Sequence, residues 1–162
     1  MSVYNELAIL FDELEDFLRN AEYKASVDGK LKEAVEYSRK RKFVEQALHL
    51  YAFTQLEASI NRKYHGATEG LEKTLFNEYN SRYSSYIQNN ANRLLLDNKR
   101  INLMDKVTFM QPSGNTTYNA IKILKDQRDT IAHGNILNGA DILSLFEKLG
   151  SLDEDLSKGE IL

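Results

Sequence analysis

Apolar residues recur at helical spacing along most of the chain. The first predicted helix carries on one face Val3, Leu7, Leu10, Phe11, Leu14, Phe17 and Leu18. The stretch SVDGK around Gly29 marks a turn or break after it. A long helix is expected from Leu31 to about Tyr64, and its second half is apolar nearly all round. This pattern predicts a central, deeply buried helix.

The stretch YHGATEG predicts the end of the central helix, with His65 and Gly66 as a C-terminal signal and Thr68 as the next N-cap. Residues 69–117 are harder to interpret, because Leu71, Leu75, Tyr79, Tyr83 and Tyr86 keep helical spacing before the sequence turns Asn-rich. We expect one or two helices there, followed by a loop around QPSGN.

The last third of the chain predicts two more helices. TYNAIKILKDQRDTIAHGN places Ile121, Leu124, Arg128 and Ile131 along one line, and NILNG reads as a turn. ADILSLFEKLG predicts a short closing helix that ends at Gly150. Residues 151–162 are acidic and are expected to form a frayed tail, which leaves one domain over 1–150.

Composition supports an all-α class, since the 162 residues include one proline and show no alternating strand pattern. Without cysteine there is no disulfide framework or thiolate zinc site, and three scattered histidines predict no metal site and no cofactor. The N-terminal segment has acids inside its apolar stretch, so neither a signal peptide nor a membrane span is expected. A cytoplasmic protein is therefore predicted.

Two charged residues interrupt apolar faces. Arg128 lies on the apolar line of its helix, and Glu57 falls inside the apolar arc of the central helix. Each buried charge needs a partner or a cleft, and pairing Glu57 with Arg128 would satisfy both. The pair can be a core salt bridge, or Arg128 can face a wet cleft with Glu57 on one side only.

His133 follows Arg128 at a spacing that turns the two side chains apart by about 140° on a continuous helix. Either the helix ends between them or they act together across a subunit interface. Gly134 and Asn135 favour a helix end there, since both residues tolerate the left-handed conformation. A histidine at that end can serve as an acid or base near neutral pH, or as a simple helix cap.

The run Arg128 to Gly134 resembles the Arg-x4-6-His signature of the HEPN superfamily (higher eukaryotes and prokaryotes nucleotide-binding), with Asp129 as the polar residue after the arginine. The pair Leu56-Glu57 matches an earlier helix of that family, while the Asn- and Tyr-rich stretch from about 77 to 117 looks like an insertion. The resemblance implies a bundle of four to five main helices. It also implies a homodimer that brings two copies of the motif together.

Many members of that family are metal-independent endoribonucleases, often toxins or anti-phage effectors, and some have a cognate antitoxin. By this resemblance His133 would move a proton, Arg128 would clamp a phosphate, and Asp129 or Thr130 would orient either one. Glu57 would support the arginine. Other members are inactive nucleotide-binding or scaffolding domains, so a non-catalytic helical module is the alternative.

Net charge is −3, so a polyanion such as RNA would have to be bound locally. The densest basic run is Arg39, Lys40, Arg41 and Lys42, which could hold an RNA backbone or form a solvated helix face. The tyrosine stripe Tyr79, Tyr83 and Tyr86, with Arg82 and Arg93, could stack on bases or form core or dimer interface. His49 and His65 are expected to be structural.

Overall fold

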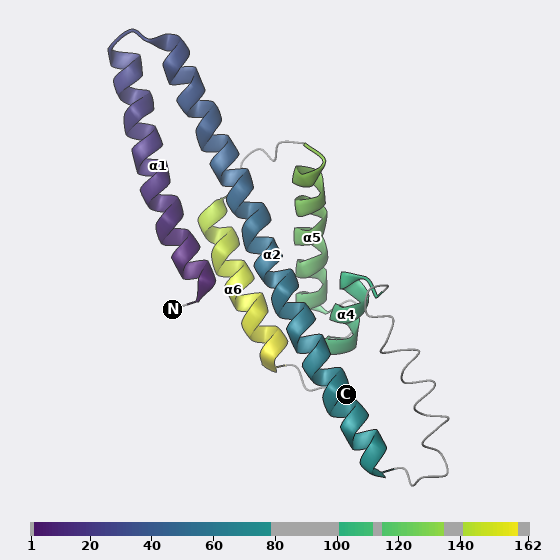
Figure 1. Cartoon of the computed structure of the whole chain (residues 1–162). Coiled ribbons are helices and arrows are strands. Elements are labelled where there is room, and N and C mark those ends of the chain that lie inside the picture. The colour runs from purple at the N-terminus through teal and green to yellow at the C-terminus, as the bar shows by residue number, and fades with distance from the viewer. Residues whose placement is uncertain (1, 79–100, 112–114, 135–140, 159–162) are drawn as a thin grey trace. The chain divides into compact units, whose positions relative to one another are not determined.

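A computed structural model describes residues 2–78, 101–111, 115–134 and 141–158, and for 70–78 and 157–158 it describes the backbone only. Within these residues the chain forms five α-helices and no strand (Figure 1), so the all-α class with four to five main helices is confirmed. Over the same residues, no helix is long and apolar enough to cross a membrane.

The chain divides into two units, which are described separately. Unit 1 consists of Met1–Leu56 and Ile123–Leu152, and unit 2 of Glu57–Lys122 and Asp153–Leu162. Helix α1 (Val3–Val27) belongs to unit 1 and α4 (Leu103–Met110) to unit 2. Both units contain parts of α2 (Leu31–Glu78), α5 (Thr116–Ala132) and α6 (Ile142–Lys158).

Helices α1 and α2 form an antiparallel hairpin, and the predicted turn at Gly29 is confirmed (Figure 1). Gly29 has a φ of 73°, and its N–H donates to the Ser26 carbonyl at 3.2 Å. The Lys30 N–H donates to the Ala25 carbonyl at 2.8 Å. This is the Schellman arrangement, in which a left-handed residue satisfies the last carbonyls of a helix.

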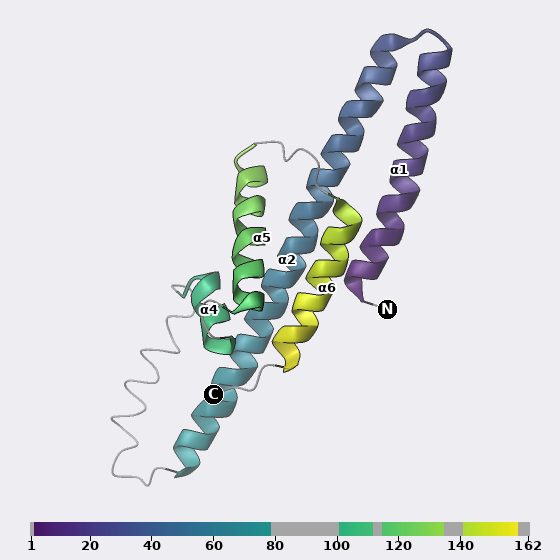
Figure 2. The ribbon, with the colours of Figure 1, turned by 180° about the vertical axis from the view of Figure 1, so that it is seen from behind.

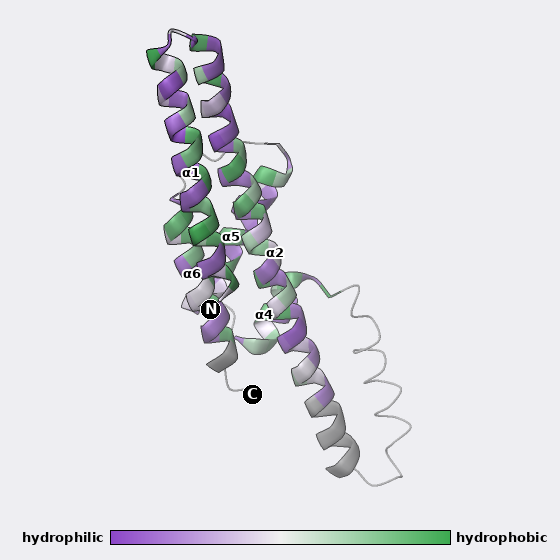
Figure 3. Ribbon diagram, turned by 60° about the vertical axis from the view of Figure 1, so that its left-hand side comes forward, coloured by the Kyte–Doolittle hydropathy of each residue, from purple (hydrophilic) through white to green (hydrophobic). Residues whose placement is uncertain are grey.

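Unit 1 buries one side of α1 against α2 and α6, and α6 runs beside these two helices in both views of the ribbon (Figures 1 and 2). Its largest fully buried side chains are Phe53, Leu56, Leu124, Phe146 and Leu149. Hydrophobic and hydrophilic residues alternate along α1 and α2 (Figure 3), as expected for helices with one buried face.

The buried face of α1 differs from the predicted one. Leu10 is 43% exposed and Phe17 is 67% exposed, although both were placed on the core face. Tyr4 and Ala25 are buried instead, together with Leu7, Phe11 and Leu18. Helical spacing marks an apolar arc wider than the contact with α2 and α6, so the packing partners decide which part of the arc is covered.

The predicted end of the central helix near Tyr64 is wrong, because α2 continues to Glu78. Gly66 has no positive φ and lies inside the helix. Thr68 is not an N-cap, since its hydroxyl donates to the carbonyls of Tyr64 and His65 at 3.0 Å each. Burial of Ala67 and Thr68 continues the packed face past the glycine, and this overrides the local stop signal.

The closing helix also runs further than predicted, past Gly150 to Lys158. Residues 151–158, expected to fray, are therefore helical. Leu152 and Leu156 are both buried and extend the stripe that begins with Leu145 and Leu149. Spacings of four and three residues keep these leucines on one face, so apolar burial outweighs the acidic composition.

Unit 2 combines an apolar core with two polar contacts. The core consists of Ile60, Tyr64, Ala67, Val107, Met110, Ile121 and Leu156. Asp153 accepts hydrogen bonds from the Ser59 hydroxyl and from Lys63 Nζ, the latter at 2.6 Å. Buried Lys106, on α4, donates to Asn61 Oδ1 at 2.8 Å. Helix α4 lies in the stretch where one or two helices were predicted.

Several predicted features lie outside the described residues. These are the tyrosine stripe of Tyr79, Tyr83 and Tyr86 with Arg82 and Arg93, the Pro-Gly part of QPSGN, the turn NILNG with Asn135, and the last four residues.

Candidate functional site

The motif lies at the C-terminal end of α5, whose start is set by Asn115. The side-chain oxygen of Asn115 accepts from the Tyr118 N–H at 2.7 Å, which satisfies a free donor of the first turn. Ile121, Leu124 and Ile131 are buried and fix the rotation of the helix. The motif residues between them are therefore held on a rigid element.

Helix α5 ends at Ala132, so the predicted end between Arg128 and His133 is confirmed. The His133 N–H donates to the Asp129 carbonyl at 3.0 Å, and the Gly134 N–H donates to the Ile131 carbonyl at 2.8 Å. Gly134 has a φ of 82°, the left-handed conformation that ends many helices. The imidazole of His133 is exposed just after the last turn.

The guanidinium of Arg128 lies between a carboxylate and an aromatic ring. Its NH1 donates to Asp129 Oδ1 at 2.7 Å, and its Cζ lies 5.4 Å from the ring centroid of Phe53 on α2. Phe53 is 1% exposed, whereas the Arg128 side chain is 29% exposed. The guanidinium is thus supported by a buried ring while part of it remains reachable from solvent.

The Asp129 carboxylate forms ion pairs with two cationic side chains, Lys125 and Arg128. Its Oδ2 accepts from Lys125 Nζ at 2.6 Å, and its pKa is lowered by Lys125 first, with further contributions from Arg128 and His133. The carboxylate is therefore ionised at neutral pH and cannot serve as a general acid there. Lys125 and Arg128 thus place two cationic side chains beside one carboxylate.

Thr130 is less suited to the role predicted for it. Its hydroxyl donates to the Asp126 carbonyl at 2.8 Å, one turn back on its own helix. This contact uses the hydroxyl proton within α5, so Asp129 is the neighbour that orients Arg128.

The predicted partner of Arg128, Glu57, is half-buried. Glu57 belongs to unit 2 and Arg128 to unit 1, so their pairing stays a prediction.

One residue of the basic run on α2, Arg41, bonds across the hairpin to α1. Arg41 donates to Glu15 Oε2 at 2.9 Å and to Glu22 Oε2 at 3.0 Å. These bonds raise the pKa of Arg41, with Glu15 contributing most, and Arg41 in turn lowers the pKa of Glu15. Lys40 Nζ lies 5.0 Å from the ring centroid of Tyr37.

Arg39 and Lys42 are exposed on α2. Of the four residues that could hold an RNA backbone or form a solvated helix face, these two have no partner among the described residues.

Two contributors to the motif were missed by the sequence analysis. Lys125 precedes Asp129 by one helical turn, so i,i+4 pairing could have indicated it. Phe53 carries no such signal, because it lies far from the motif in the sequence. Among the described residues, no cluster of three His, Asp or Glu residues could hold a metal ion.

His49 proves to be the most buried histidine of the described residues, at 3% exposure. Its Nε2 has no hydrogen-bond partner among the described residues, and burial lowers its pKa. The structural role expected for it agrees with this burial.

No protein-family model matches the chain, and neither a curated protein nor a solved structure shows significant similarity to it.

Proposed function

We propose that this chain is an endoribonuclease in which Arg128 clamps a phosphate and His133 transfers protons. The observation that supports it is the group at the end of α5, where a half-exposed, oriented guanidinium precedes an exposed imidazole at the helix end. Reaction through the RNA's own 2′-hydroxyl needs a cation at the phosphate and a group that moves protons. The motif offers both types of side chain.

In the proposed reaction the 2′-oxygen attacks the adjacent phosphorus and loses its proton to a base. The bond from phosphorus to the 5′-oxygen breaks, and that oxygen gains a proton. The products are a 2′,3′-cyclic phosphate and a 5′-hydroxyl. His133 moves one of these protons, while Arg128 neutralises charge on the phosphorane.

Asp129 orients Arg128 by accepting a hydrogen bond from one guanidinium nitrogen, and the other nitrogens would bind the substrate phosphate. Lys125 and Phe53 hold this pair in place, since one binds the carboxylate and the other supports the guanidinium. RNA binding would draw the guanidinium towards a phosphate oxygen, with Asp129 keeping hold of one nitrogen.

A denaturing gel tests the proposal. Mixed cellular RNA is incubated with wild-type protein, with His133→Ala and with the control His65→Ala, all in excess chelator. His65 is exposed on α2, outside the motif. We expect cleavage by the wild type and the control, and none by His133→Ala. Cleavage by all three would remove His133 from the mechanism, and cleavage by none would favour a non-catalytic nucleotide-binding or scaffolding module.

We further propose that Arg128 and His133 of different copies form each site, as the paired motifs of the family that the chain resembles would imply. Mixing Arg128→Ala with His133→Ala tests this. One of the two sites in each mixed dimer would then hold both residues, so about a quarter of wild-type activity should return. No recovery after subunit exchange would show that the two residues act within one chain.

We also propose that the endoribonuclease acts as a toxin and that a cognate antitoxin protein binds it. Cell growth after induction provides the measurement. Wild-type protein should arrest growth, and His133→Ala should not.

A further inference from the structure

One side of the α1–α2 hairpin carries apolar side chains that the described residues leave uncovered. On α1 these are Leu10 at 43% exposure, half-buried Leu14, and Phe17 at 67% exposure. Their spacing of four and then three residues places them on one stripe of the helix. The same spacing occurs on α2 in Val44, Leu48 and Tyr51, and Tyr51 is 50% exposed.

The two stripes lie on the same side of the hairpin. Arg41 bonds Glu15 and Glu22, which fixes the side of α1 that meets α2 and leaves Leu10 and Phe17 on one flank. Because the helices are antiparallel and right-handed, the matching flank of α2 is the one with Val44 and Tyr51. The outer face is defined here as Leu10, Leu14, Phe17, Val44, Leu48 and Tyr51.

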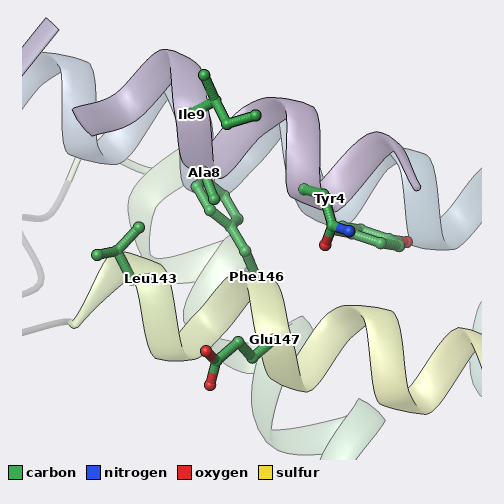
Figure 4. Close-up of a pocket in the computed structure, with 7 residues that line it drawn as sticks. Tyr4, Ala8, Ile9, Leu143, Phe146 and Glu147 are labelled. Atoms are coloured by element: carbon green, nitrogen blue, oxygen red, sulfur yellow. The ribbon is translucent and has the colours of Figure 1, made fainter. Parts of the chain in front are cut away.

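The opposite flank of the hairpin is occupied by α6. An apolar hollow of about 360 Å³ lies there between α1 and α6, and its lining includes Ala8, Ile9, Leu143 and Phe146 (Figure 4). Phe53, which supports Arg128, also points away from the outer face, since nine residues on a helix separate it from Val44 by about 180°. Neither α5 nor α6 of unit 1 therefore covers the outer face.

We infer that a second copy of this chain docks on the outer face, so that two hairpins form a four-helix bundle. Charge selects this partner. Helix α1 carries six acids and two bases, whereas residues 31–56 of α2 carry five bases and three acids. A copy that lays its α1 on the other copy's α2 brings a net negative helix against a net positive one. The same arrangement keeps all neighbouring helices antiparallel and satisfies two-fold symmetry.

The alternative pairing, α1 on α1, brings two acidic helices together and is disfavoured by repulsion.

This contact does not depend on RNA cleavage, and it leaves the motif of each copy accessible. If the motif also joins two copies, the chain uses two separate interfaces and forms a tetramer. A substitution that disrupts the outer-face contact would then reduce the tetramer to a dimer. If the outer face is the only interface between copies, the same substitution would reduce a dimer to a monomer.

Light scattering of the full chain tests the inference with a matched pair of phenylalanines. Phe17 lies on the outer face, and Phe43, which is 72% exposed on α2, lies off it. We expect Phe17→Glu to halve the mass of the wild type and Phe43→Glu to leave it unchanged, while circular dichroism shows both helical. A monomeric wild type, or a Phe17→Glu variant with unchanged mass, would overturn the inference.

Cysteine pairing identifies which helices meet, because the natural chain contains no cysteine. Phe17→Cys and Val44→Cys, carried on chains with different tags, are mixed and oxidised mildly. The inferred arrangement gives the mixed disulfide as the main product, since Arg41 places position 17 near the level of position 44. A disulfide mainly between two copies of Phe17→Cys would overturn the pairing of α1 with α2.

Discussion

Acidification should destabilise the fold through His49, whose ring is 3% exposed and whose Nε2 has no hydrogen-bond partner among the described residues. Burial lowers the pKa of His49 in the folded chain, because the charged ring would lose its hydration. In the unfolded chain a histidine titrates near pH 6.5. Below that pH the unfolded state binds one more proton than the folded state, so the free energy of unfolding falls.

The size of the effect follows from this linkage. The full stability is present above about pH 6.5, and each pH unit below it removes up to about 1.4 kcal/mol until the lowered folded-state pKa is reached. Replacing His49 by leucine removes the titrating group and the unpaired nitrogen while keeping a similar volume. A buried polar atom without a partner costs about 1–3 kcal/mol, so His49→Leu should raise the free energy of unfolding by about 1 kcal/mol.

Urea unfolding followed by circular dichroism at about pH 7.5, 6.5 and 5.5 measures both effects. Wild type should lose up to about 1.4 kcal/mol between the last two pH values through this residue, and His49→Leu should lose correspondingly less. His65→Leu, at an exposed histidine, is the control for the exchange of a histidine for leucine. An unchanged slope in His49→Leu, or a loss of stability at the highest pH, would refute the reasoning.

Two further predictions concern the hairpin and the helix ends. Arg41→Ala should lower the free energy of unfolding by about 1–3 kcal/mol, because it removes charged hydrogen bonds to Glu15 that are only partly exposed. Urea unfolding measures this change, with Lys42→Ala as the control. If both variants are as stable as the wild type, the prediction is wrong. Gly134→Ala should lower the free energy of unfolding by about 1–2 kcal/mol, since a φ of 82° strains an L side chain. Gly150→Ala should raise the free energy of unfolding by about 0.5–1 kcal/mol, because it replaces a glycine inside α6. The melting temperatures of the two variants must shift in opposite directions.

The two His-Gly pairs of the chain show where sequence reasoning succeeds and where it fails. His133-Gly134 ends α5 as predicted, and Gly134 adopts the left-handed conformation. His65-Gly66 carries the same local signal, yet α2 runs through it. The difference lies in Thr68, which is buried and bonded to the preceding turn. A stop signal thus works only where no buried residue continues the helix, and burial depends on distant segments.

The same limit applies to α1, where spacing predicted the helix but not the part of its apolar arc that is buried. Leu10 and Phe17 belong to that arc and remain exposed, because α6 lies on the other flank of the hairpin. Their exposure is informative only once the packing is known. In the sequence they look like core residues, and in the structure they mark a surface that a second copy can cover.

For the motif, the local part was predictable and the support was not. Arg128, Asp129 and the helix end follow from a short stretch of sequence, and Lys125 lies one turn away on the same helix. Phe53 comes from α2 and meets the guanidinium only through the packing of unit 1. The position of Arg128 therefore depends on a buried aromatic ring that no motif contains. Conversely, an arginine in the same motif without such a ring would be less restrained, and its phosphate clamp would be less well organised.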